Sequence, residues 1–311
     1  MRIVSLLPSA TEIICGLGLR DSLVGVTHEC DYPADVLGLP VVTTSRIPKG
    51  LDSAEIDALV NGQLETDSAL YSLKTDVLNQ LAPDLIVTQA LCDVCAVSAD
   101  EVNAVSCQLP GDVRVINLEP SCLDDVLDTV LLVGESAGCS ATAQQYHAGL
   151  KRRVEAVAER SAAIARESRP RVAILEWIEP LFDGGHWYPE LIELAGGIPC
   201  FGHRHSPSRR RSWQELVDAA PEVVLVSLCG FDLSRTALDI PLLTKCPEYG
   251  MLPAAQAGRV YAVDGNSYFS RPGPRLVDSL EILAHLLHPQ RHPLPAGLPT
   301  AVAIDRMAEE L

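Results

Sequence analysis

The chain repeats one pattern of helix and strand in its two halves, and this repeat constrains the fold more than any single motif does. Segment 78–87 (LNQLAPDLIV) matches segment 216–225 (LVDAAPEVVL), and each joins the end of a helix to a buried strand. Two further pairs match in the same way: 2–4 with 171–173, and 114–117 with 259–262. The repeat predicts two topologically similar lobes.

Within the first half, short apolar runs alternate with amphipathic segments. Ser9 and Glu12 have the spacing of a capping box, which predicts that the first helix has Ser9 as its N-cap. The alternation is typical of the α/β class, in which helices cover both faces of a mainly parallel sheet. We expect strands at 3–7, 22–26, 84–88 and 113–117, and helices at 51–60, 68–81 and 123–138.

Residues 140–168 contain no proline, and only Gly149 interrupts the helix formers. A helix of that length spans ~40 Å at 1.5 Å per residue, more than a crossover inside one lobe needs. We therefore predict two α/β lobes joined by one long helix, with a ligand cleft between the lobes. The expected boundaries are 1–135 for the first lobe, 136–169 for the connecting helix, 170–288 for the second lobe, and 289–311 for a Pro-rich, loosely packed extension.

The net charge of −17 makes nucleic acid and anionic lipid unsuitable partners, because phosphates would be repelled. No apolar run reaches the ~20 residues that span a bilayer, so we expect no membrane insertion. The chain shows no signal peptide, which predicts a cytoplasmic location; a trimmed form of an exported protein, periplasmic or extracellular, would look the same. We also expect a monomer. Its ten cysteines are dispersed and are expected to be reduced thiols.

Candidate ligand-binding residues follow the predicted strands, because ligands of such sheets bind beyond the carboxyl ends of the strands. Aromatic residues make up only 5% of the chain, yet many of them fall in these loops. Such rings suit a large, flat, partly apolar ligand, although they could instead pack the junction between lobes. The candidates are Ser9, His28, Glu29, Gln89, Cys92, Trp177, Phe182, His186, Trp187, Phe231, Tyr268 and Phe269.

The pair Cys92-Asp-Val-Cys95 admits four interpretations. A zinc knuckle needs a second pair, which is missing, and Asp93 opposes the low thiol pKa of a redox pair. Packing cysteines and a ligand-facing loop remain open. The repeat places Cys229 opposite Cys92, so Cys92, Cys95 and Cys229 could share a transition metal or contact the metal of a ligand.

Four segments resemble one known family: 3–12 (IVSLLPSATE), 24–33 (VGVTHECDYP), 82–86 (APDLI) and 270–275 (SRPGPR). They are similar to the cobalamin-binding type of ABC-transporter substrate-binding protein, a group that also binds siderophores and haem. The resemblance implies two Rossmann-like lobes joined by one long backbone helix, cobalamin as the ligand, and an ABC transporter permease as a partner. It also implies that Trp187, Tyr268 and Phe269 contact a corrinoid.

The sequence contains no Ser/His/Asp arrangement and no phosphate-cradling glycine loop after the first strand, so we expect a binding protein and not an enzyme. The leading hypothesis is a binder of cobalamin or a related corrinoid, acting as a cytosolic carrier or a transporter-associated component. One alternative is a binder of haem, a ferric siderophore or another large metallated small molecule. Another is a thiol- or metal-dependent enzyme that uses Cys92, Cys95 and Cys229.

Overall fold

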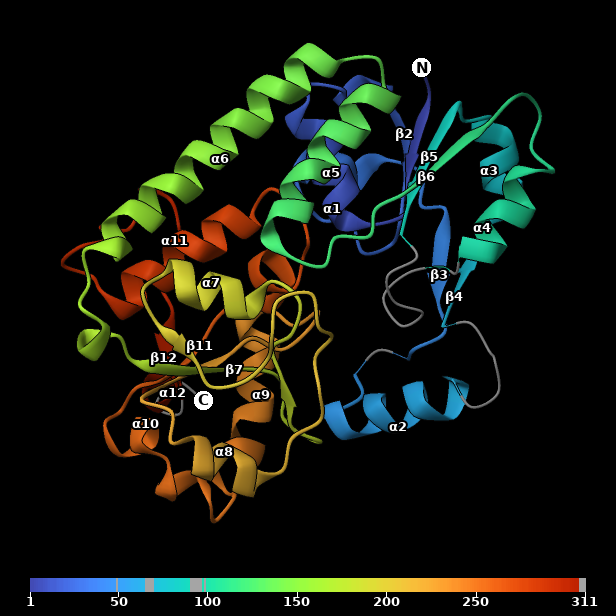
Figure 1. The fold of residues 1–311 in the computed structure, drawn as a ribbon. Coiled ribbons are helices and arrows are strands. Elements are labelled where there is room, and N and C mark those ends of the chain that lie inside the picture. The colour runs from blue at the N-terminus through green and yellow to red at the C-terminus, as the bar shows by residue number, and fades with distance from the viewer. Residues whose placement is uncertain (49, 65–69, 90–96, 98, 308–311) are drawn as a thin grey trace. The chain divides into compact units, whose positions relative to one another are not determined.

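The computed structural model describes residues 1–307 except 49, 65–69, 90–96 and 98 (Figure 1). Its described residues form two compact units. The first comprises 1–51, 55–120 and 124–149, and the second comprises 52–54, 121–123 and 150–311. The long helix α6 (Ser140–Ala162) begins in the first unit and ends in the second. It is shorter than expected because the chain turns into a 3-10 turn at Arg166–Ser168 before the next strand.

The first unit is built on a four-stranded parallel sheet in the order β2-β1-β5-β6. Figure 1 shows α1 and α5 on one face of this sheet and α3 and α4 on the other. A separate antiparallel pair, β3 and β4, joins Ser45 to Tyr71. The strands are β1 (Ile3–Ser5), β2 (Leu23–Val26), β3 (Thr43–Ser45), β4 (Tyr71–Leu73), β5 (Leu85–Thr88) and β6 (Arg114–Asn117); the helices are α1 (Pro8–Gly16), α2 (Ser53–Leu64), α3 (Thr75–Leu81), α4 (Ala99–Ser106) and α5 (Leu123–Ser136).

The second unit has a sheet in the order β12-β11-β10-β7-β8, with β9 also paired to β7. The central strands β11, β10 and β7 are parallel, and Figure 1 shows α7 and α11 on one face and α8 and α9 on the other. The strands are β7 (Arg171–Trp177), β8 (Phe182–Asp183), β9 (Ile198–Pro199), β10 (Val223–Val226), β11 (Val260–Ala262) and β12 (Val302–Ala303); the helices are α7 (Tyr188–Leu194), α8 (Trp213–Ala219), α9 (Leu233–Thr244), α10 (Pro253–Gln256), α11 (Leu276–Leu287) and α12 (Ile304–Met307).

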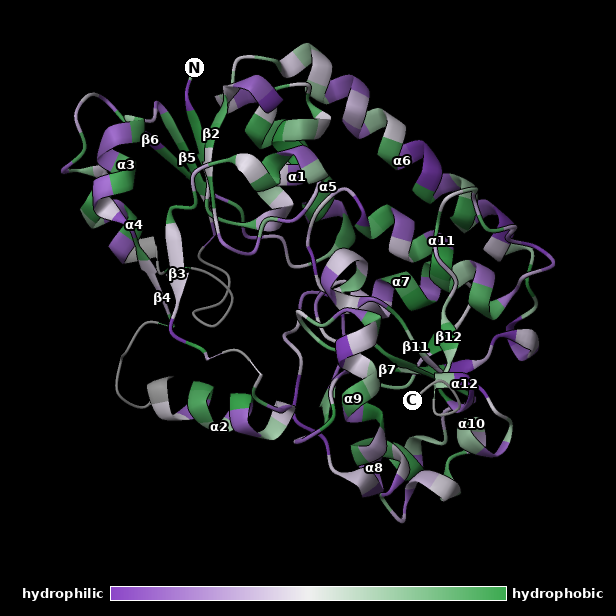
Figure 2. Ribbon diagram, turned by 180° about the vertical axis from the view of Figure 1, so that it is seen from behind, coloured by the Kyte–Doolittle hydropathy of each residue, from purple (hydrophilic) through white to green (hydrophobic). Residues whose placement is uncertain are grey.

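The predicted α/β class, with parallel strands at the centre of both sheets, is confirmed. Central strands such as β1, β5 and β10 are buried and hydrophobic, whereas α6 mixes hydrophilic and hydrophobic residues along its length (Figure 2). Among the helices of the part of the chain described, none is both long enough and apolar enough to cross a membrane.

The sequence repeat is also a repeat of contacts at the amino edge of each sheet. The backbone N–H of Arg2 donates to Asp84 Oδ2 (2.6 Å), and that of Arg171 donates to Glu222 Oε2 (2.9 Å). Each arginine Nε also donates to a carbonyl at the end of the helix that precedes the partner strand, 2.6 Å to Leu81 of α3 and 3.0 Å to Ala220 after α8. Each half therefore secures its first strand to the strand of the matching segment by the same pair of hydrogen bonds.

Two local predictions in the first unit are wrong. α1 begins at Pro8 with Leu7 as its N-cap, and no side chain caps it, so Ser9 lies inside the helix. Proline is favoured at the first helical position because its φ is already helical, and this moves the start ahead of Ser9. Segment 68–81 is not one helix: β4 precedes α3, and the alternation of Tyr71-Ser72-Leu73 suits a strand.

The prediction of a loosely packed extension after residue 288 is also wrong for the part of that segment that the structure describes. Strand β12 pairs antiparallel with β11, with Ala303 opposite Tyr261. The buried His292 contacts Ser161 Oγ of α6 through Nε2 (3.1 Å), and its carbonyl lies 2.8 Å from His285 Nδ1 of α11. The proline-rich composition gave no indication of the short strand β12 or of the buried His292, which attach this segment to the rest of the second unit.

Acid should weaken that attachment. Burial, together with Arg160, His288, Arg291 and His285, lowers the pKa of His292 from 6.5 to about 4. The unfolded chain therefore binds a proton that the folded chain rejects, so stability present above pH 6.5 is lost as the pH falls towards 4, by at most about 3 kcal/mol.

The thermal unfolding midpoint of the wild type should fall between pH 7 and pH 5. It should fall less for His292→Gln, which lacks the titrating imidazole. His203→Gln, which changes an exposed histidine, is the control and should behave like the wild type. Equal drops for His292→Gln and the wild type would contradict the assignment.

A second prediction concerns Ala82 and Ala220, which end α3 and α8 in the left-handed region with φ of 40° and 45°. A left-handed residue with a Cβ costs roughly 1–2 kcal/mol, whereas glycine loses about 0.4–1 kcal/mol through the entropy of the unfolded chain. Ala82→Gly and Ala220→Gly should each raise the unfolding midpoint in urea slightly, by about 0.5 kcal/mol in free energy. A lower midpoint for either variant would show that its backbone is not strained.

Candidate functional site

In the first unit, the candidate polar residues follow β1, β2 and β5 at the carboxyl edge of the sheet. Ser9 and Gln89 are buried, at 2% and 7% exposure. Below them the Thr11 hydroxyl donates to Ser5 Oγ (2.8 Å) and lies 3.0 Å from the buried Cys30 Sγ. Among the predicted residues of this unit that the structure describes, Ser9 and Gln89 are therefore buried, whereas the His28 side chain is partly exposed and Glu29 is exposed.

His28 is held by a chain segment that sequence reasoning did not connect with it. Val26 of β2 forms a parallel bridge with Val41, which brings residues 27–28 beside Thr43 at the start of β3. The Thr43 hydroxyl lies 2.7 Å from His28 Nδ1, and the Tyr71 ring of β4 lies 5.4 Å from the imidazole, tilted by 40°. The adjacent strands β3 and β4 thus supply two of the neighbours that position this imidazole.

In the second unit, Trp177 and Phe231 come together at the ends of β7 and after β10. Their ring centroids are 5.2 Å apart, and the Arg235 guanidinium lies 4.1 Å above the Phe231 ring. Trp177 is partly exposed, and its Nε1 donates to the Ser53 carbonyl (3.2 Å). The structure therefore joins two of the predicted aromatic residues into one cluster with a cation stacked on it.

The segment Asp183-Gly184-Gly185-His186-Trp187 approaches another part of the backbone closely at Gly185. A Cβ on Gly185 would lie 2.2 Å from the backbone nitrogen of Ser208, which no side chain allows. Asp183 Oδ1 accepts from the backbone N–H of Arg209 (2.7 Å), and Asp183 Oδ2 lies 2.8 Å from Arg211. These contacts fix the loop that carries His186.

Trp187 and Phe269 are both buried, and a hydrogen bond joins the side chain of Trp187 to the backbone of Phe269. The Trp187 indole, 5% exposed, donates to the Phe269 carbonyl (3.0 Å), and the Phe269 side chain is fully buried. Phe182, His186 and Tyr268 are partly exposed, and Arg275 lies 5.3 Å from the Tyr268 ring centre. The structure gives Trp187 and Phe269 a packing role; contact of the predicted aromatic residues with a ligand stays a prediction.

A polar network that the sequence did not reveal lies beside these rings. The buried Tyr188 hydroxyl is 3.2 Å from Ser227 Oγ and 3.4 Å from Ser270 Oγ, and burial with nearby Glu176 raises its pKa well above 10. The Ser208 hydroxyl donates to the Glu176 carboxylate at the end of β7. Because this phenol stays protonated, the network offers neutral hydroxyl groups and one carboxylate. Serine residues leave no periodic signal, which is why sequence reasoning missed them.

The cysteine hypothesis stays a prediction. Cys92 and Cys95 lie outside the described residues, and Cys229 is an exposed thiol after β10. Whether the three sulfurs approach one another is therefore not a property that this structure describes. Burial lowers the pKa of His186, so its imidazole is neutral at pH 7.

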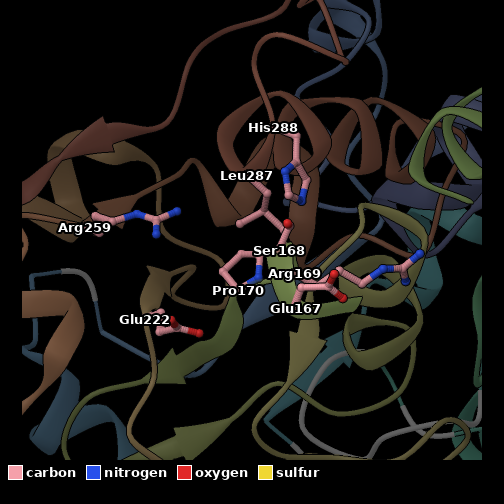
Figure 3. Close-up of a pocket in the computed structure, with 8 residues that line it drawn as sticks. All are labelled: Glu167, Ser168, Arg169, Pro170, Glu222, Arg259, Leu287 and His288. Carbon is pink, nitrogen blue, oxygen red and sulfur yellow. The ribbon is translucent and has the colours of Figure 1, made fainter. Parts of the chain in front are cut away.

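A polar hollow of about 280 Å³ lies at the opposite, amino edge of the second sheet (Figure 3). Pro170, Glu222 and Arg259 directly precede β7, β10 and β11, and His288 follows α11. Ligand pockets span roughly 300–1,000 Å³ and lie beyond the carboxyl ends of parallel strands. The hollow is therefore too small for a tetrapyrrole and lies at the edge that ligands of such sheets do not use.

Known proteins of similar sequence and fold point to one kind of binding protein. A vitamin B12-binding protein of Vibrio cholerae is 22% identical over 287 residues, covering 90% of this chain and 86% of the relative. An ABC transporter substrate-binding lipoprotein of Bacillus subtilis is 22% identical over 293 residues, covering 93% and 80%. The crystal structure of a periplasmic haem-binding protein from Pseudomonas aeruginosa superposes with a TM-score of 0.72 at 21% identity, covering 97% of both chains.

The predicted cytoplasmic location is contradicted by these comparisons. The Bacillus subtilis relative is a lipoprotein, and the Pseudomonas aeruginosa neighbour is periplasmic. The prediction relied on the lack of a recognisable signal peptide in the sequence. That is insufficient, because the rest of the chain contains no feature that distinguishes one compartment from another.

The family is shown by a match over most of the chain. The model of a family described as periplasmic binding protein matches residues 3–266, which includes β1 of the first sheet and β11 of the second. Members of this kind are substrate-binding components of ABC transporters and not enzymes, as the sequence predicted. The chain belongs to the periplasmic binding protein family.

Proposed function

We propose that this protein binds a corrinoid, cobalamin or a close relative, and presents it to an ABC transporter permease. The observation that carries the proposal is the similarity to vitamin B12-binding protein along 90% of the chain, together with accessible aromatic side chains at the carboxyl edge of the second sheet. Trp177, which packs against the buried Phe231, and Tyr268 would cover apolar parts of the macrocycle.

The charges at this edge favour a corrinoid over haem. Haem carries two carboxylates, which need cations, whereas the periphery of a corrinoid carries amides that need hydrogen-bond partners. Arg211 and Arg235 are each paired with a carboxylate, Asp183 at 2.8 Å and Asp239 at 2.9 Å. The net charge of −17 also disfavours an anionic ligand. Hydroxyl groups such as those of Ser208 and Ser270 suit amide partners.

Trp177 tests the proposed aromatic contact. Replacing Trp177 by Leu should weaken binding of dicyanocobinamide about tenfold in calorimetry, equivalent to about 1.4 kcal/mol, because the ring face is lost. Trp177→Phe keeps a ring and should stay close to the wild type. Tyr249→Leu removes a half-buried aromatic residue in the turn before α10 and serves as the matched control.

The same calorimetry should be run with cyanocobalamin, haemin and a ferric hydroxamate. Tight binding of the two corrinoids and weak binding of the others is the expected result. Tighter binding of haemin than of either corrinoid would overturn the proposed ligand while leaving the family membership intact.

A further inference from the structure

His186 has a backbone conformation that residues with a side chain rarely adopt. It lies in the turn between β8 and α7, and its φ of 51° falls in the left-handed region. Unlike Ala82 and Ala220, it does not end a helix. Gly184 and Gly185 directly precede it, yet the chain has a histidine at a position that glycine would occupy without strain. Strain of this kind concentrates at ligand-binding and catalytic sites, so it points to a role for the imidazole.

Backbone contacts impose this conformation and leave the imidazole out. The backbone N–H of His186 donates to the Ser206 carbonyl (2.6 Å), and Gly185 lies against the backbone of Ser208. The ring itself is partly exposed. Burial lowers its pKa, with no contribution from a charge or a hydrogen bond of any residue that the structure describes. The imidazole is therefore neutral at pH 7, and one of its two nitrogens has a lone pair.

The residue before His186 is bonded to the strand end that carries Trp177. The backbone N–H of Gly185 donates to the Ser208 hydroxyl oxygen (3.1 Å), and the Ser208 hydroxyl donates to the carboxylate of Glu176. Glu176 directly precedes Trp177, the last residue of β7. His186 is thus connected to one of the aromatic contacts of the proposed function.

The residue after His186 is bonded to the segment that carries Tyr268. The Trp187 indole donates to the carbonyl of Phe269, the residue after Tyr268 (3.0 Å). The same indole lies beside the imidazole, with ring centroids 5.5 Å apart and planes tilted by 31°, and so limits its orientation. All of these residues belong to the second unit. Within that unit, hydrogen bonds on both sides hold His186 between the segments of Trp177 and Tyr268.

We propose that His186 supplies an axial nitrogen ligand to the cobalt of the bound corrinoid; this rests on the proposed function. Hydroxyl groups can serve the amides of a corrinoid, whereas its metal favours a neutral imidazole. The lone pair of one ring nitrogen forms the bond to cobalt and a cobalt-bound water leaves, so the oxidation state of the metal does not change. The other ring nitrogen keeps its proton.

The first test compares His186→Asn with the wild type. Asparagine also tolerates the left-handed region and can form hydrogen bonds, but it has no imidazole nitrogen. His203→Asn makes the same change at an exposed histidine of the second unit and is the matched control.

Calorimetry uses aquocobinamide, which lacks a nucleotide base, so that any nitrogen ligand must come from the protein. His186→Asn should bind it about tenfold more weakly, and His203→Asn should bind it like the wild type. Dicyanocobinamide, measured in cyanide buffer, keeps cyanide on its cobalt, so the same variant should lose at most about twofold.

The second test reduces the bound aquocobinamide to Co(II) with dithionite and records electron paramagnetic resonance. The wild type and His203→Asn should show the triplet splitting of one axial nitrogen-14, and His186→Asn should lose it. Wild-type protein made with nitrogen-15 histidine should show a doublet instead, a result that does not depend on how any variant folds.

Binding without nitrogen splitting in the wild type, or splitting retained in His186→Asn, would overturn the ligation and leave the corrinoid-binding function standing. Equal weakening of both cobinamides by His186→Asn would also overturn it, because the ring would then contact another part of the ligand. A lack of any binding of aquocobinamide, dicyanocobinamide and cyanocobalamin would overturn the function itself, and the ligation with it.

Discussion

Parallel pairing between central strands determines where each half of this chain can present a ligand-binding side chain. β1 and β5 run in register from Ile3 opposite Leu85 to Ser5 opposite Val87, so the loops after both strands leave at one edge. β7 and β10 do the same in the second unit. At the other edge, Asp84 and Glu222 bind the backbone of the first strand of each sheet. The amino edge of each sheet is thus occupied by hydrogen bonds that stabilise the fold, whereas the candidate ligand-binding residues follow the strands at the carboxyl edge.

The small sheet of β3 and β4 lies outside the main sheet of the first unit and positions the His28 side chain. It lengthens the edge beside β2 through the bridge of Val26 to Val41, and so places the Thr43 hydroxyl against His28. The Thr27 hydroxyl then decides the direction of the Thr43 proton, and with it the tautomer of the imidazole. The chemical state of one ring nitrogen therefore depends on the pairing of two three-residue strands.

The sequence predicted the parts of the fold that repeat and missed the parts that do not. The match of 78–87 with 216–225 indicated the repeat, and the structure adds that Asp84 and Glu222, which are aligned in it, make equivalent contacts. It could not show that Tyr71 lies in a strand, because the segment 68–81 was interpreted as one helix. It placed Ser9 as a cap because Ser9 and Glu12 have the right spacing, whereas Pro8 fixes the start of the helix.

At the candidate site, the sequence identified the loops but not the orientation of side chains within them. Trp187 and Phe269 were predicted to contact a ligand. The Trp187 indole instead donates to the Phe269 carbonyl, and both side chains are buried. Whether a residue after a strand faces solvent or the interior depends on such contacts with distant segments, which spacing does not encode. At Gly185 the residue type itself reflects such a contact, because the close approach of the Ser208 backbone excludes every other residue type there.

Under the proposed function, discrimination between a corrinoid and haem has to come from charge, because an aromatic side chain such as Trp177 would cover either macrocycle. Arg211 and Arg235 each form an ion pair with a carboxylate, Asp183 and Asp239 respectively. Haem would bring two more carboxylates to an already acidic protein, whereas a cobalt corrinoid brings a positive centre and neutral amides. These charges therefore favour the corrinoid of the proposed function over an anionic tetrapyrrole.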